Sequence, residues 1–109
     1  MAITSLSILI PTFNDLCVNL VEGLRLQAEE TGIAYEILVA DDGSTDEDVV
    51  RQNNVISQWP NCRYLRHTDN IGRAAIRNLL ARTAQHEWLL FIDSDMTLIR
   101  PDFLAPSTR

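Results

Sequence analysis

Lysine is absent from this chain of 109 residues, and all nine basic residues are arginine. Without lysine, a Walker-type phosphate loop, Schiff-base catalysis and any phospho-acceptor site that depends on a lysine are excluded. The fifteen acidic residues give a formal net charge of -6. Because an acidic surface repels a phosphate backbone, nucleic acid is not an expected partner.

Cysteine and histidine are also scarce. Cys17 and Cys62 lie far apart on apolar segments, which favours small core residues over a zinc pair of the C-x-x-C type. His67 and His86 are isolated, so no Ser-His-Asp or Cys-His nucleophile is predicted. The N-terminus shows no cationic, apolar leader, and we expect a reducing, cytoplasmic setting.

Long apolar runs are missing as well. The longest run, residues 88–92, is far shorter than the ~20 residues that a membrane helix needs, so no membrane span is expected in this segment. With 46% hydrophobic and 22% charged residues, the composition is that of one soluble globular domain. A chain this short buries only about two-thirds of its unfolded surface, so an exposed sheet edge is a candidate contact for an oligomer.

The apolar pattern predicts four strands that alternate with three helices. Residues 6–10 and 35–40 favour buried parallel strands, and residues 62–66 and 87–92 are expected to form a third and a fourth. Between the strands, residues at helical spacing predict three helices. They are Leu16, Leu20, Val21, Leu24 and Ala28 in the first helix, Val49, Val50 and Ile56 in the second, and Ala75, Ile76, Leu79, Leu80 and Thr83 in the third.

Polar residues at the predicted helix ends indicate where the helices start and stop. Asn14 is expected to cap the first helix and Gly32 to end it. Thr45 with Asp48 resembles a capping box at the start of the second helix.

This alternation predicts an α/β fold, with a doubly wound, mostly parallel, Rossmann-like sheet in three α/β/α layers. Ligands bind such sheets at the carboxyl ends of the strands. If the strand order is 3-2-1-4, the ends of the second and fourth strands lie about 10 Å apart. Residues 101–104 look like the first turn of a further helix, so we expect residues 1–109 to be the N-terminal part of a longer domain.

Two carboxylates follow the fourth strand. In an extended backbone Asp93 and Asp95 point to the same side, and their mutual repulsion is relieved by a cation. Oxygen ligands in this arrangement suit Mg²⁺ or Mn²⁺ shared with a substrate phosphate. The alternative is a turn or helix cap with solvated acids.

Asp41 and Asp42 close the second strand before Gly43, which tolerates a positive φ. A strand-to-helix connection of this composition is also sound without any ligand. Arg73, after Gly72 at the start of the third helix, is a candidate to hold a diphosphate, although a solvated arginine explains it equally well.

Four segments together resemble the inverting family-2 glycosyltransferases of GT-A fold. Each is weakly diagnostic alone, but their order and their places at strand ends make the resemblance specific, and it covers the chain from about Ser5 to Leu104. The segments are Ile10-Pro11-Thr12-Phe13-Asn14, Asp41-Asp42-Gly43-Ser44-Thr45-Asp46, Asn70-Ile71-Gly72-Arg73 through Arg77-Asn78, and Phe91-Ile92-Asp93-Ser94-Asp95.

The resemblance implies a role for each matching residue toward a nucleotide-diphospho-sugar donor, expected to be a UDP-sugar. Pro11 and Thr12 would line the nucleotide pocket, and Asp42 would accept a hydrogen bond from the base, with Asp41 as its neighbour. Arg73 would lie near the phosphates and Asp93, with Ser94 beside it, near the ribose. Asp95, aided by Asp93, would bind the Mn²⁺ or Mg²⁺ that bridges the diphosphate. The donor site implied by the resemblance thus comprises Pro11, Thr12, Asp41, Asp42, Arg73, Asp93, Ser94 and Asp95.

The resemblance also implies what this segment would not do alone. The family's general base lies later than the metal motif and is expected beyond residue 109, so the segment would bind donor and hardly transfer sugar. The acceptor, whether glycan, lipid or protein, stays open. Family members often act at the cytoplasmic face of a membrane, where this chain would be peripheral.

Two other classes compete with this interpretation. A receiver-like signalling domain also binds Mg²⁺ through strand-end acids, but it would place the paired acids after the first strand and would use a lysine. A non-catalytic interaction module on the same fold is the third reading, because fold does not determine function. Metal-dependent UDP binding separates the first class from the other two.

Overall fold

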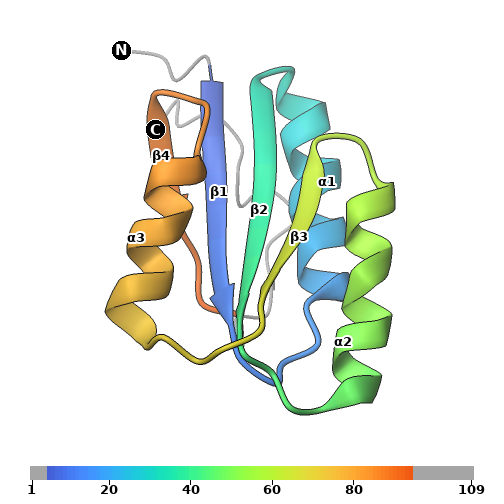
Figure 1. Cartoon of the computed structure of the whole chain (residues 1–109). Coiled ribbons are helices and arrows are strands. Elements are labelled where there is room, and N and C mark those ends of the chain that lie inside the picture. The colour runs from blue at the N-terminus through green and yellow to red at the C-terminus, as the bar shows by residue number, and fades with distance from the viewer. Residues whose placement is uncertain (1–4, 95–109) are drawn as a thin grey trace.

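The computed structural model describes residues 5–94, which form a parallel sheet with helices on both faces (Figure 1). Its strands have the order β3-β2-β1-β4, and every neighbouring pair is parallel. The predicted 3-2-1-4 order is therefore confirmed. The elements in chain order are β1 (Ser5–Thr12), α1 (Val18–Thr31), β2 (Ala34–Asp42), α2 (Glu47–Asn53), the 3-10 helix η1 (Asn54–Gln58), β3 (Cys62–His67), α3 (Arg73–Thr83) and β4 (Trp88–Phe91).

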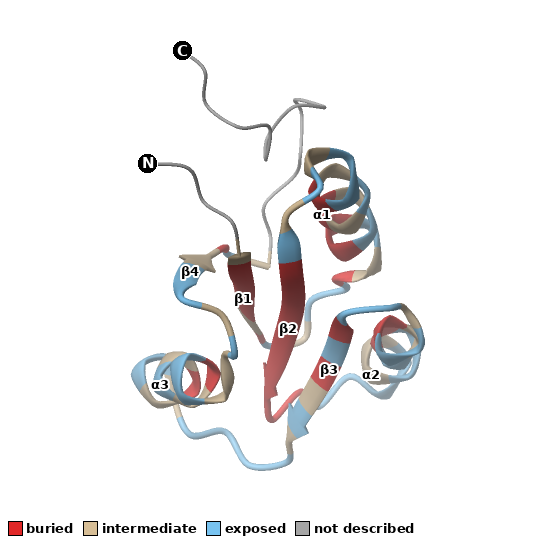
Figure 2. Ribbon diagram, turned by 90° about the horizontal axis from the view of Figure 1, so that it is seen from above, coloured by how far each residue is buried: buried red, intermediate tan, exposed pale blue. Residues whose placement is uncertain are grey.

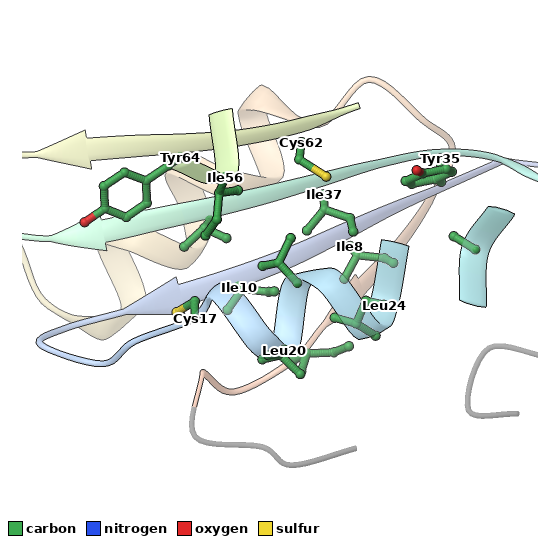
Figure 3. Close-up of a cluster of buried hydrophobic side chains, with 14 of the residues drawn as sticks. Ile8, Ile10, Cys17, Leu20, Leu24, Tyr35, Ile37, Ile56, Cys62 and Tyr64 are labelled. Carbon is green, nitrogen blue, oxygen red and sulfur yellow. The ribbon is translucent and has the colours of Figure 1, made fainter. Parts of the chain in front are cut away.

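The two faces of the sheet carry separate apolar clusters, which explains the nearly unbroken apolar runs of β1 and β2. On one face, Ile8, Ile10 and Ile37 pack against α1 and η1, with Leu24 and Ile56 among the buried side chains (Figure 3). On the other face, a smaller cluster packs against α3; it comprises Leu9, Leu38, Ala40, Ile76 and Leu80. Figure 2 shows α3 alone on its side of the sheet, so the three-layer α/β/α prediction is confirmed.

The helix ends differ from the prediction in two places. Gly32 ends α1 with φ 73°, as expected. Asn14, however, does not cap α1: the residue before the helix is Cys17, which makes no side-chain cap. The second helix starts one residue later than expected, because Asp46 and not Thr45 accepts the amides of Asp48 and Val49, at 3.1 and 3.2 Å.

The outer strand β4 exposes part of its apolar surface. Trp88 and Leu89 are each 42% exposed. Leu16, which helical spacing placed in the first helix, lies before α1 and is 46% exposed. Within residues 5–94, no helix has the length and apolar character needed to cross a membrane. The oligomer contact expected at a sheet edge stays a prediction.

Candidate functional site

A cavity of about 390 Å³ opens where β1, β2 and β4 end and α3 begins. This is the edge of a parallel sheet at which ligands bind, because the strand ends and a helix N-terminus converge there. Side chains from four separate segments line it: Pro11, Thr12, Phe13, Asp15, Asp42, Arg73, Ile76, Arg77, Asp93 and Ser94.

The structure brings most of the predicted site residues together in this cavity. Those that line it are Pro11, Thr12, Asp42, Arg73, Asp93 and Ser94. Asp41 does not line the cavity, and Asp95 lies outside the described residues. Residues from segments more than fifty positions apart therefore meet at one point, as the fold class predicted.

Asp41 is occupied inside the protein. It is fully buried, and one carboxylate oxygen accepts the amide of Ser44 at 2.7 Å while the other accepts the hydroxyl of Tyr64. Burial, reinforced by the bond to Asp41, raises the pKa of Tyr64 well above its ordinary value, so the phenol keeps its proton. These bonds show that Asp41 stabilises the turn between β2 and α2. A direct contact between Asp41 and a nucleotide stays a prediction, and the burial of this carboxylate does not favour it.

Asn14 holds the loops after β1 and β2 together. Its side-chain oxygen accepts the amides of Thr45 and Asp46 at 2.8 and 2.9 Å, and its backbone amide donates to the hydroxyl of Ser44 at 2.7 Å. The structural role predicted for Asn14 is thus found, but at the neighbouring loop and not at α1. These bonds connect the loop that follows Pro11 and Thr12 to the loop that follows Asp42.

Asp15 was missed by the sequence analysis. Its carboxylate accepts the hydroxyl of Ser94 at 2.9 Å, which joins the loop after β1 to the segment after β4. The buried Asn53 fixes the same loop from the other side, since its side-chain amide donates to the carbonyl of Asp15 at 2.9 Å and its oxygen accepts the amide of Cys17 at 2.8 Å. The strand-end rule that selected Asp93 would also have selected Asp15.

Arg77, which belongs to the third family segment, also lines the cavity, although the sequence did not predict it as a site residue. It lies one helical turn after Arg73, so both side chains are on the face of α3 that lines the cavity. Its guanidinium lies 4.2 Å from the centre of the Phe91 ring, which holds it against β4. The i, i+4 spacing from Arg73 would have identified it.

Both carboxylates and arginines therefore line the cavity. Asp93 is exposed, and within residues 5–94 its carboxylate forms no hydrogen bond or ion pair. Across the same described range, no three His, Cys, Asp or Glu side chains are gathered closely enough to hold a metal ion by themselves. One or two carboxylates are still enough for Mg²⁺ or Mn²⁺ when substrate phosphates supply the remaining oxygen ligands.

The fold, the strand order and this strand-end cavity define a GT-A type α/β domain, and solved structures agree. The S. aureus TarS 1-349 structure in complex with UDP is 28% identical, has a TM-score of 0.67 and aligns with 84% of this chain and 27% of that one. The Pyrobaculum calidifontis mannosyltransferase in complex with GDP-Man and Mn²⁺ has a TM-score of 0.72 at 24% identity, covering 91% of this chain and 30% of that one.

Residues 7–106 match the family model described as Glycosyl transferase family 2, and the chain belongs to that family. Chondroitin synthase of Escherichia coli is 35% identical over 97 residues, which cover 86% of this chain and 14% of the synthase. The chain spans between 9% and 37% of the length of the curated relatives it matches.

Proposed function

We propose that this chain forms the donor-binding part of an inverting, metal-dependent glycosyltransferase that takes a sugar from a nucleotide-diphospho-sugar. The observation that carries the proposal is the cavity that Asp42, Arg73 and Asp93 line together at the strand ends. Membership of glycosyltransferase family 2 supplies the reaction class.

The lining residues divide into a nucleoside side and a phosphate side. Pro11, Thr12 and Asp42 would receive the base, and Asp93, with Ser94 beside it, the ribose. Arg73 lies at the start of α3, where a guanidinium and the first helical amides both favour an anionic diphosphate. UDP in the related TarS structure, at 28% identity, supports a uridine nucleotide as the donor.

A divalent cation, Mn²⁺ or Mg²⁺, would be held by Asp95 and Asp93 together with the diphosphate. When bound, such an ion neutralises charge on the leaving nucleoside diphosphate. Arg73 would stabilise the same charge from the helix side. The general base is expected beyond residue 109, so this chain would bind donor without transferring the sugar to its glycan, lipid or protein acceptor.

We expect the protein to act in the cytoplasm, peripherally at the cytoplasmic face of a membrane. This location follows from the resemblance alone and is tested by fractionation of cells that express the protein. A protein that sediments with the membranes and is released into the soluble fraction by salt agrees with the proposal. Secretion of the protein would contradict it.

Thermal unfolding with Mn²⁺ alone, UDP alone and both together tests donor binding. A ligand that binds only the folded protein increases the free energy of unfolding by mass action, by about 2.7 kcal/mol at a hundredfold excess over Kd. The melting temperature rises as a result. We expect a substantial rise only when UDP and Mn²⁺ are both present. A rise with acetyl phosphate and Mg²⁺ instead would favour the receiver-like class.

Asp95→Ala should abolish the joint effect of UDP and Mn²⁺ while the protein remains folded. Glu87→Ala is the matched control, because it removes one exposed carboxylate at the opposite end of β4. If UDP with Mn²⁺ protected the Asp95 variant as well as the control, the metal-ligand assignment would be wrong. If no nucleotide protected the unaltered chain, the donor-binding proposal would be wrong for this segment.

A further inference from the structure

The carboxylate of Asp42 is bound by the loop that leads into α3. Its two oxygens accept the amide of Ile71 at 2.7 Å and the amide of Gly72 at 3.1 Å. The side-chain amide of Asn70 donates to the carbonyl of Asp42 at 2.9 Å. Three hydrogen bonds thus join the end of β2 to three consecutive residues immediately before Arg73.

Gly43 allows this loop to lie directly on the end of β2. A Cβ added at Gly43 would lie 2.6 Å from the backbone nitrogen of Asn70 and 2.9 Å from the carbonyl carbon of Asp69. Its φ of 77° is also one that other residues rarely adopt. Only glycine fits here without displacing backbone, so Asp42 and Gly43 together set the position of the loop.

The loop in turn determines where α3 begins. Gly72 precedes the helix and provides no side-chain cap, so the anchor comes from Asp42 on another element. The first amides of a helix have no partner within it, and they favour an anion placed at the N-terminus. Arg73 is the first residue of α3, and its guanidinium reaches the cavity from this anchored end.

We propose that Asp42 is a positioning residue for the diphosphate, in addition to any contact it makes with the base. By holding residues 70–72 it places the N-terminus of α3 and Arg73, so recognition of the base and of the phosphates depends on one carboxylate. This inference rests on the proposed function, because it assumes that a nucleoside diphosphate fills the cavity.

The two roles are compatible in one side chain. A carboxylate offers about four acceptor positions, and the loop uses two of them. The remaining positions can accept an N–H from a base on the cavity side. Asp42 therefore connects the nucleoside side of the cavity to its phosphate side through the loop.

Asp42→Asn separates positioning from electrostatics because the two effects have opposite signs. Asparagine keeps one acceptor oxygen but replaces the other with an NH2 group that only donates, so one of the amides of Ile71 and Gly72 loses its partner. Removing a negative charge near Arg73 would by itself strengthen the binding of an anion. A loss of phosphate affinity can therefore come only from misplacement of the loop and helix.

The experiment measures the affinity of the protein for UDP, and for pyrophosphate with Mg²⁺, by calorimetry. We expect Asp42→Asn to weaken pyrophosphate binding about tenfold, which corresponds to ~1.4 kcal/mol. Gly43→Ala should weaken it as well, because it displaces the loop while the carboxylate of Asp42 remains. Asp69→Asn is the control: it removes one charge from the same loop, and its exposed carboxylate forms no hydrogen bond within the described residues.

Amide hydrogen exchange by NMR provides a second measurement that needs no ligand. In Asp42→Asn, the amides of Ile71 and Gly72 should exchange faster while the amides in the centre of β2 keep their rates, which shows that the protein is folded. Unchanged exchange at both positions would overturn the positioning role.

Binding of pyrophosphate as tight as in the unaltered protein, or tighter, would also overturn it and leave Asp42 with the base alone. An unaltered protein that binds neither UDP nor pyrophosphate would overturn the proposed function and the diphosphate part of this inference. The exchange rates would still decide whether Asp42 holds the loop.

Discussion

Through its side chain, Asn14 binds the loop after β2, which lies about thirty residues further along the chain. Its backbone is left-handed, with φ 56°, a conformation that asparagine tolerates better than most residues. This conformation turns the side chain toward the loop after β2 and away from α1. Spacing along the chain predicted a cap for the nearest helix, because it carries no information about a partner thirty residues away.

Asn14→Ala should destabilise the protein by roughly 2 kcal/mol. The exposed amides of Thr45 and Asp46 lose their acceptor, and each such hydrogen bond typically contributes about 0.5–1.5 kcal/mol net, while alanine adds strain at a positive φ. The free energy of unfolding, measured in urea, checks this value. Asn14→Asp keeps an acceptor oxygen and is the matched variant, whose stability should stay close to that of the unaltered protein.

Asn14→Gly distinguishes the two causes, because glycine removes the backbone strain but not the missing acceptor. Its stability should lie between those of the alanine variant and the unaltered protein. Equal stability of all the variants would show that the side chain of Asn14 does not hold the two loops together.

At the scale of elements, the helices and strands were predictable because each has one dominant cause. β1 and β2 are apolar runs buried on both faces, and α1 and α3 carry apolar residues at helical spacing. The ends were less predictable. Thr45 and Asp46 are both good cap residues, and the choice of Asp46 follows from Asn14, which holds the amides of both from another loop.

Asp46→Ala should therefore weaken the start of α2 by about 1 kcal/mol, the usual cost of losing a side-chain N-cap. α2 is short and rests on the cap for the amides of Asp48 and Val49. Hydrogen exchange of these two amides should accelerate, while exchange in the centre of α1 stays constant. Thr45→Val is the comparison: if it costs more than Asp46→Ala, the cap would be Thr45 as the sequence suggested.

At the scale of the whole molecule, the sheet order and the cluster of strand-end residues were predictable, and the contacts within the site were not. Parallel topology brings β1, β2 and β4 to one edge whatever their side chains, which is why Thr12, Asp42 and Asp93 meet. Asp41 is bound inside the protein by Tyr64 of β3, whereas Asp42 lines the cavity and binds the loop before α3. This difference arises because successive residues of β2 point to opposite faces of the sheet. Adjacent residues of the same type gave no basis to separate them.

Folding as a whole should become less favourable in alkali. Burial is the main cause that raises the pKa of Cys17 from 9.0 to about 11, and that of Cys62 from 9.0 to about 11. In the unfolded chain these thiols lose their protons near the ordinary value, whereas in the folded protein they keep them until about pH 11. Unfolding thus releases protons in this window, and the free energy of unfolding falls as the pH rises from about 9 to about 11.

Urea denaturation at about pH 8 and about pH 10 measures this loss. Replacement of both cysteines by alanine should reduce the difference between the two pH values, because the ionising thiols are gone. Part of the difference should persist, since burial also raises the pKa of Tyr35 to about 12. An equally steep loss in the alanine variant would show that the thiols do not cause it.

The central position of β1 has a consequence for the order in which the protein assembles. β1 pairs with β2, the next strand, and with β4, the last described strand of the chain. The first pairing closes a short loop, whereas the second must wait for almost the whole described chain and closes a far longer one. Asp93 and Ser94 reach the cavity only through the pairing of β1 with β4, so in a nascent chain the cavity forms after β1 and β2 have paired, and a ligand bound there would stabilise only molecules in which β4 has joined the sheet.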